Sequence, residues 1–117
     1  MKKVIVAEDD AGVQDSIRMV LEDAGYDVTV LSGGESLLGT EYDLPDVFIL
    51  DKQLSGVDGL DICRFLKTQG RTKNIPVIMI SASSRIDMLA KDAQADGVLE
   101  KPFRIEALRD MVARHTA

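Results

Sequence analysis

Short runs of apolar residues alternate along this chain with segments in which apolar residues recur at helical spacing. The runs are rich in β-branched residues and mostly continuous: Val4–Ala7, Val28–Leu31, Val47–Leu50, Val77–Ile80 and Val98–Leu99. Strands that are covered on both faces, as in a parallel sheet, have this pattern. The sequence therefore predicts five strands of a parallel sheet.

Amphipathic segments follow the runs, with apolar residues three or four positions apart. In the first segment Val13, Ile17, Leu21 and Ala24 share one face, and Gly25 follows as a helix stop. Similar faces lie at Leu60–Leu66, Ile86–Ala93 and Ile105–Val112. We also expect a short second helix around Glu35–Gly39, which lies between glycines.

The strand–helix unit thus occurs five times, which predicts a three-layer α/β fold, a doubly wound (βα)5 parallel sheet with helices on both faces. With the flavodoxin-like strand order 2-1-3-4-5, the first and third strands are neighbours where the order reverses. Ligands in such sheets bind beyond the carboxyl ends of the strands at that point. A chain of 117 residues suits one such domain, so we expect residues 1–117 to form a single domain.

Four of the five predicted strands end in polar residues. Glu8 and Asp9 follow the first strand and Asp51 follows the third, so the three carboxylates should lie within a few ångström. Carboxylates this close repel one another unless a cation lies among them, and Mg²⁺ prefers such oxygen ligands. The second run ends at Leu31-Ser32 without a charge, as expected for an edge strand.

A lysine and a hydroxyl complete this set. Lys101 follows the fifth strand and is a point charge suited to a phosphoryl oxygen, while Ser81 ends the fourth strand and offers a hydroxyl donor. A carboxylate nucleophile, Mg²⁺, a lysine and a hydroxyl are the parts needed for phosphoryl transfer to an aspartate. Asp10 and Asp58 have a plainer interpretation as helix caps.

The charge balance excludes several other functions. Asp and Glu total 20 against 14 Lys and Arg, giving a net charge of −6, which disfavours nucleic acid and anionic membranes as partners. One cysteine, Cys63, excludes a disulfide framework and a multi-cysteine zinc site. No apolar run approaches the roughly 20 residues of a membrane span, and the N-terminal apolar run is too short for a signal peptide. We therefore expect a cytoplasmic protein.

Several segments together resemble the receiver domains of two-component response regulators. These segments are Val4–Asp10, Val47–Asp51, Leu54–Gly59, Pro76–Ala82 and Glu100–Phe103. They occur in the family's order and at fitting distances, and the resemblance covers essentially the whole chain.

The resemblance implies a magnesium site and its ligands. Asp9 and Asp51 would bind Mg²⁺ directly, with the backbone carbonyl of Gln53 as a third protein ligand, and Glu8 would act through a metal-bound water. Asp51 would be the phosphoacceptor.

The resemblance also implies the remaining roles. Lys101 would hold a phosphoryl oxygen, Ser81 would swing to hydrogen-bond the phosphoryl group, and the Lys101–Pro102 peptide bond would be cis. The donor would be a phosphohistidine on a sensor histidine kinase or a histidine phosphotransfer protein. The domain would be a signalling switch that catalyses only its own phosphorylation and dephosphorylation, with a possible homodimer through the face of the fourth helix, fifth strand and fifth helix.

This chain departs from the family pattern in four places. Val98 stands where many receivers have an aromatic residue, Ser55 replaces a frequent proline, and Lys52 lies where many members are apolar. The stretch from Ser81 to Lys101 also looks about two residues shorter than usual.

The sequence disfavours two other functions. A Mg²⁺-dependent phosphatase with an aspartate nucleophile would carry a second aspartate two residues later, where this chain has Gln53. A flavodoxin-like flavin or nucleotide binder would need a glycine-rich phosphate loop, where Glu8, Asp9 and Asp10 would repel phosphate. The chain's beginning just before the first strand and its end after the last helix favour a stand-alone domain or a trimmed piece of a longer protein.

Three predictions concern residues outside the site. Cys63 lies on a core-facing helix and should be a buried, unreactive thiol. His115 should be a solvated residue at a helix end, and Asp96 should be a solvated charge.

Overall fold

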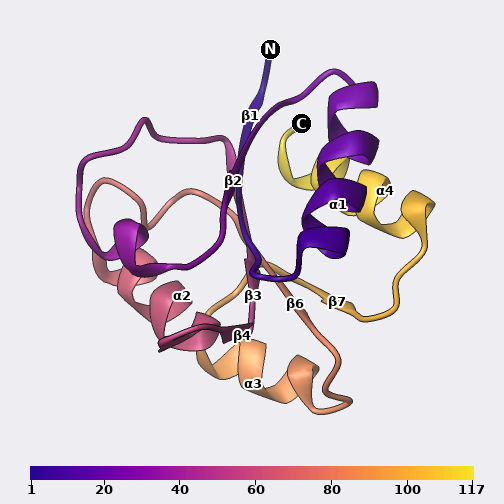
Figure 1. Ribbon diagram of the computed structural model, residues 1–117. Coiled ribbons are helices and arrows are strands. Elements are labelled where there is room, and N and C mark those ends of the chain that lie inside the picture. Colours follow the sequence, from indigo (N-terminus) through magenta and orange to yellow (C-terminus); the bar gives the residue numbers. More distant parts are fainter.

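The computed structural model describes residues 1–117 and contains a five-stranded parallel sheet in the order β2-β1-β3-β6-β7 (Figure 1). The strands are β1 (Lys3–Ala7), β2 (Asp27–Leu31), β3 (Val47–Asp51), β6 (Val77–Ser81) and β7 (Gly97–Glu100). With β6 and β7 as the fourth and fifth strands of this sheet, the predicted order 2-1-3-4-5 and the predicted fold are confirmed.

Helices cover both faces of the sheet. On one face lie α1 (Ala11–Asp23) and α4 (Ile105–His115), and on the other lie α2 (Gly59–Thr68) and α3 (Ile86–Asp92) (Figure 1). Alternate residues of each strand point to opposite faces, so Val4 packs with the α1 and α4 side while Ile5 packs with the α2 and α3 side. This two-sided burial explains why the strands are continuous apolar runs.

The predicted second helix is wrong as an α-helix. Residues Glu35–Leu38 form a single 3-10 turn, η1. Leu37 is fully buried and anchors the turn, and Gly34 lies so close to α2 that a Cβ there would be 2.0 Å from Ile62. Packing against α2 therefore fixes this segment, and four residues are too few for an α-helical hydrogen-bond ladder.

A small ribbon follows β3 and was not predicted. The two-residue strands β4 (Gln53–Leu54) and β5 (Val57–Asp58) pair in antiparallel fashion. Ser55 and Gly56 form the turn between them, and Gly56 adopts φ +84°, a conformation that glycine reaches without steric cost. The ribbon lies at the carboxyl end of the main sheet.

Two predicted helix caps are confirmed. The Asp10 carboxylate accepts a hydrogen bond of 3.0 Å from the Val13 N–H at the start of α1. The Asp58 carboxylate accepts one of 2.8 Å from the Leu60 N–H at the start of α2. Such bonds satisfy amide groups that have no partner within the helix, and they begin both helices next to the carboxyl ends of the strands.

Asp96 is exposed, as predicted, whereas His115 is only partly exposed, and both residues also have specific hydrogen-bond partners. Asp96 accepts hydrogen bonds from the Lys67 ammonium at 2.6 Å and from the Val77 N–H at 2.8 Å. The His115 ring nitrogens lie 2.8 Å from the Met111 carbonyl oxygen and 3.2 Å from the Asp96 carbonyl oxygen. Both residues therefore tie helix ends to the beginnings of β6 and β7.

Cys63 is fully buried on α2, as predicted. Burial raises the pKa of its thiol to about 11, and the sulfur donates to the Ala93 carbonyl at 3.4 Å.

None of the helices is both long and apolar enough to cross a bilayer.

Candidate functional site

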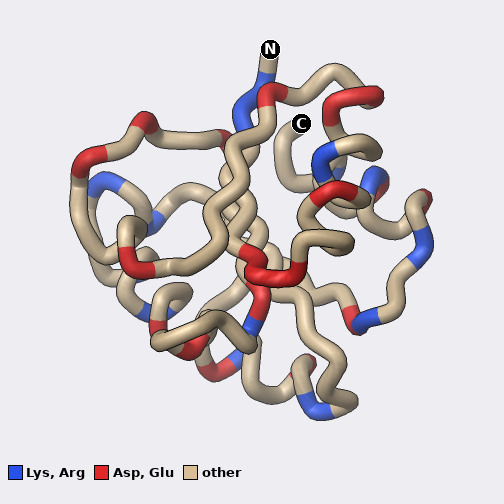
Figure 2. Tube along the Cα trace, in the orientation of Figure 1, with Lys and Arg blue, Asp and Glu red and all other residues tan.

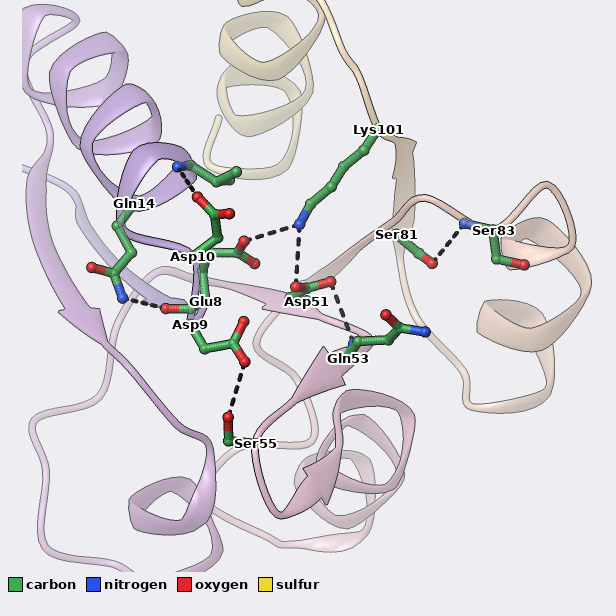
Figure 3. Close-up of polar contacts among 11 residues, drawn as sticks. Glu8, Asp9, Asp10, Gln14, Asp51, Gln53, Ser55, Ser81, Ser83 and Lys101 are labelled. Carbon is green, nitrogen blue, oxygen red and sulfur yellow. Dashed lines mark hydrogen bonds and ion pairs between the residues drawn. The ribbon is translucent and has the colours of Figure 1, made fainter.

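The carboxyl ends of four neighbouring strands bring the predicted site residues to one edge of the sheet. Glu8 and Asp9 follow β1, Asp51 ends β3, Ser81 ends β6 and Lys101 follows β7 (Figure 3). The pairing register aligns these ends, because Asp51 is level with Ile80 on β6 and Ser81 is level with Glu100 on β7.

Three carboxylates form the centre of the site. One carboxylate oxygen from each of Glu8, Asp9 and Asp51 lies within 4.8 Å of those of the other two. Glu8 is fully buried and Asp51 is 5% exposed, whereas Asp9 is exposed. Figure 2 shows these acidic positions gathered where β1 enters α1 and where β3 ends.

Lys101 connects two of the three carboxylates. Its ammonium donates to Glu8 Oε1 at 2.9 Å and to Asp51 Oδ2 at 3.2 Å. Burial alone would lower the pKa of Lys101, but the hydrogen bonds to Glu8 and Asp51 outweigh it and the pKa is raised. The lysine therefore stays charged. The predicted cis Lys101–Pro102 bond is present, and the Lys101 N–H donates to the Ser81 carbonyl at 2.7 Å.

One lysine does not balance three carboxylates. Glu8 Oε2 is buried and has no hydrogen-bond partner. Burial, reinforced by the neighbouring Asp51, raises the pKa of Glu8 from 4.5 to about 7. A divalent cation would relieve this deficit, and an all-oxygen donor set is the kind that Mg²⁺ prefers. The residues present therefore fit a magnesium ion.

The β4–β5 ribbon contacts the carboxylates of Asp9 and Asp51. The Gln53 N–H donates to Asp51 Oδ1 at 3.4 Å, and the Ser55 hydroxyl donates to Asp9 Oδ2 at 3.1 Å (Figure 3). The ammonium of Lys52 pairs with Asp58 at 3.3 Å and so adds no second cation to the cluster.

Ser81 is present at this edge, but its hydroxyl does not bond to the carboxylates or to Lys101. Ser81 Oγ accepts a hydrogen bond of 3.0 Å from the Ser83 N–H (Figure 3). This hydrogen bond lies within the loop that follows β6. Ser81 is buried, with 3% of its surface exposed.

Two further residues support the site and were not assigned a role from the sequence. A Cβ at Gly59 would lie 1.9 Å from the Asp51 carbonyl oxygen, so only glycine lets α2 begin directly behind Asp51. The Gln14 side-chain amide donates to the Glu8 carbonyl, which fixes the loop between β1 and α1. The motif containing Gly59 was visible in the sequence, whereas nothing local marks Gln14.

A family model described as the response regulator receiver domain matches residues 4–113. The chain belongs to this family. It is a receiver domain of two-component response regulators, which is a signalling domain, and the resemblance noted in the sequence is confirmed. The phosphatase alternative is not favoured.

Similar proteins agree with this assignment. A probable transcriptional regulatory protein of a Picosynechococcus species is 40% identical over 96% of this chain and 47% of its own length. The DNA-binding dual master transcriptional regulator RpaA of a Synechocystis species is 36% identical over 97% of this chain and 47% of its own length. A putative response regulator of Chloroflexus aurantiacus has a solved structure with a TM-score of 0.92 at 30% identity, covering 98% of this chain and 97% of that one. The chain spans about half the length of the curated relatives it matches.

Proposed function

We propose that this receiver domain accepts a phosphoryl group on Asp51 from a phosphohistidine of a sensor histidine kinase or a histidine phosphotransfer protein. An Asp51 carboxylate oxygen would bond to phosphorus while the bond between phosphorus and the histidine nitrogen breaks. The observation that carries this proposal is the position of Asp51. It lies at the end of a central strand, bonded by Lys101 at 3.2 Å and within 4.8 Å of two more carboxylates.

Magnesium fits this proposal. The carboxylates of Asp9 and Asp51 and the backbone carbonyl of Gln53 would hold the ion, with Glu8 beside them. When bound, the ion would offset the negative charge of the carboxylates and of the incoming phosphoryl oxygens. The unpartnered Glu8 Oε2 and the all-oxygen donor set support this assignment.

Lys101 and Ser81 would bind the transferred group. Lys101 donates to two carboxylates, and its hydrogen bond to Asp51 would pass to a phosphoryl oxygen once the carboxylate is phosphorylated. Ser81 would exchange the Ser83 N–H for the phosphoryl group, which links phosphorylation to the loop between β6 and α3. Water would later hydrolyse the acyl phosphate and restore Asp51.

The proposal is tested with a small phosphodonor. Acetyl phosphate with Mg²⁺ should add one phosphoryl group, visible by intact mass spectrometry, and Asp51→Asn should abolish the adduct. Asp61→Asn, which alters an exposed aspartate on α2, is the matched control and should be phosphorylated like the wild type. Persistence of the adduct in Asp51→Asn would remove Asp51 as the acceptor.

Phosphorylation would switch contacts with other proteins. The face of α3, β7 and α4 carries the exposed apolar residues Met88 and Ile105, 62% and 56% exposed, which supports a homodimer there. Sedimentation before and after phosphorylation measures it. The net charge of −6 argues against DNA binding by these 117 residues themselves, so a transcriptional output would need another protein segment.

A further inference from the structure

The turn of the β4–β5 ribbon lies beside the acidic cluster (Figure 3). Ser55 stands at this turn, and its hydroxyl donates to Asp9 Oδ2 at 3.1 Å (Figure 3). The contact joins residues that lie 46 positions apart in the chain. It is therefore a property of the folded site and not of the local sequence.

Asp9 differs from the other two carboxylates in how it is held. Lys101 bonds both Glu8 and Asp51, and both of these side chains are buried. Asp9 is exposed, and the Ser55 hydroxyl is the single hydrogen-bond partner of its side chain. Without this bond the carboxylate would be free to turn between rotamers, and ordering it would cost conformational entropy.

The ribbon gives Ser55 a fixed position. Leu54 is 8% exposed and pairs with Val57 across the ribbon, so the turn is anchored in the core. Gly56 closes the turn at φ +84°, and a Cβ there would lie 2.9 Å from Glu35 Oε1. The turn is thus anchored in the core by Leu54 and lies beside the Glu35 side chain of η1.

The same ribbon also touches Asp51 through the Gln53 N–H at 3.4 Å. Two of the three carboxylates are therefore bonded by residues two positions apart on one short ribbon. A hydroxyl at position 55 is needed for the second bond. The proline that many receivers carry there has no side-chain donor.

We propose that Ser55 is a positioning residue that orients the Asp9 carboxylate toward the divalent cation. The inference rests on the proposed magnesium site. Ligating carboxylates are themselves held by hydrogen bonds, and loss of such a partner commonly weakens metal binding by about 10- to 100-fold. Since Asp9 is exposed, the effect should lie near the lower end of that range.

The experiment compares Ser55→Ala with Ser55→Thr, which keeps a hydroxyl. Mg²⁺ is titrated alone into each protein at constant ionic strength, and the amide resonances of Asp9 and Gln53 are followed by NMR. We expect about tenfold weaker affinity in Ser55→Ala, and wild-type affinity in Ser55→Thr. Ser36→Ala, an exposed serine on η1, is the matched control and should bind like the wild type.

The outcomes separate this inference from the proposed function. A wild-type protein that does not respond to Mg²⁺ contradicts the metal site itself. A wild-type protein that binds Mg²⁺, with Ser55→Ala equal to it, overturns only the role of Ser55. Equal weakening in the alanine and threonine variants also overturns that role, because the hydroxyl is then not the cause.

Discussion

The two ends of the sheet each carry a lysine among oxygen acceptors, but only the carboxyl end leaves an acceptor without a donor. At the amino ends of β6 and β7, the Lys67 ammonium bonds Asp96 at 2.6 Å and the Ile75 carbonyl at 2.9 Å. The same Asp96 oxygen also accepts the Val77 N–H. At the carboxyl end, Lys101 serves two carboxylates and Glu8 Oε2 has no partner.

This difference separates a stabilising cluster from a binding cluster. The Lys67 cluster pairs one positive with one negative charge, and none of its buried side-chain polar atoms lacks a partner, so we call it the saturated end of the sheet. The Lys101 cluster has three carboxylates beside one lysine, and a further cation would offset the excess negative charge. Buried groups with shifted pKa values and missing partners are typical of functional sites.

The largest difference between the Lys67 and Lys101 clusters should appear when the Glu8 carboxylate is replaced by a neutral amide. The pKa of Glu8 is about 7 in the folded chain against 4.5 for an ordinary carboxyl, so the folded state holds this proton more tightly than the unfolded state. The metal-free protein should then lose stability as pH rises from about 4.5 to about 7. The loss from this group is about 3 kcal/mol.

Glu8→Gln should remove that loss. Urea unfolding without metal should show the advantage of the variant over wild type growing between pH 5 and pH 8, and Mg²⁺ should shrink it. Glu100→Gln, at an exposed position, controls for the loss of one negative charge. An advantage of the same size at both pH values would contradict the inference that burial raises the pKa of Glu8.

The next largest effect on stability is expected from Lys67, at the saturated end of the sheet. Lys67→Met should lower the free energy of unfolding by about 2 kcal/mol, because Asp96 and the partly buried Ile75 carbonyl lose a charged donor. Phosphoryl uptake from acetyl phosphate should stay at the wild-type level, whereas Lys101→Met should lose it. Lys73→Met, an exposed lysine nearby, is the matched control for stability. Loss of uptake in Lys67→Met would mean that the two ends are coupled.

The sequence was sufficient for the sheet and for most of the site because both depend on local patterns. Continuous apolar runs marked the strands, and polar residues directly after the runs marked their carboxyl ends. A parallel sheet brings such ends to one edge, so the proximity of Glu8, Asp51 and Lys101 could be anticipated without coordinates.

The remaining features depend on contacts that no local pattern encodes. The η1 turn is set by its packing on α2, and the strands of the β4–β5 ribbon are two residues each, too short to show a period. Asp96 is exposed as predicted, but its ion pair with Lys67 could not be predicted because the two residues lie 29 positions apart. Likewise, the bond between Ser55 and Asp9 depends on the shape of the ribbon.

An effect of similar size on stability is expected at Gly59, the first residue of α2. Gly59→Ala should destabilise the protein by about 2 kcal/mol, since the new methyl group would collide with the Asp51 backbone. Phosphoryl uptake should fall as well, because Asp51 must shift. Gly70→Ala, at the other end of α2, meets nothing within 4 Å and should be tolerated. Similar stabilities for the two variants in urea unfolding would contradict the close approach of α2 to Asp51.

The smallest effect on stability should come from His115. This residue lies in the last turn of α4 and bonds to the same end of the sheet as Lys67. Its ring nitrogens lie 2.8 Å from the Met111 carbonyl oxygen and 3.2 Å from the Asp96 carbonyl oxygen. His115→Ala should cost about 1 kcal/mol in urea unfolding, since these carbonyls lose one donor. Mg²⁺ affinity should not change, because the residue lies at the opposite end of the sheet from the carboxylates. A change in Mg²⁺ affinity with unchanged stability would reverse the roles given to the two ends.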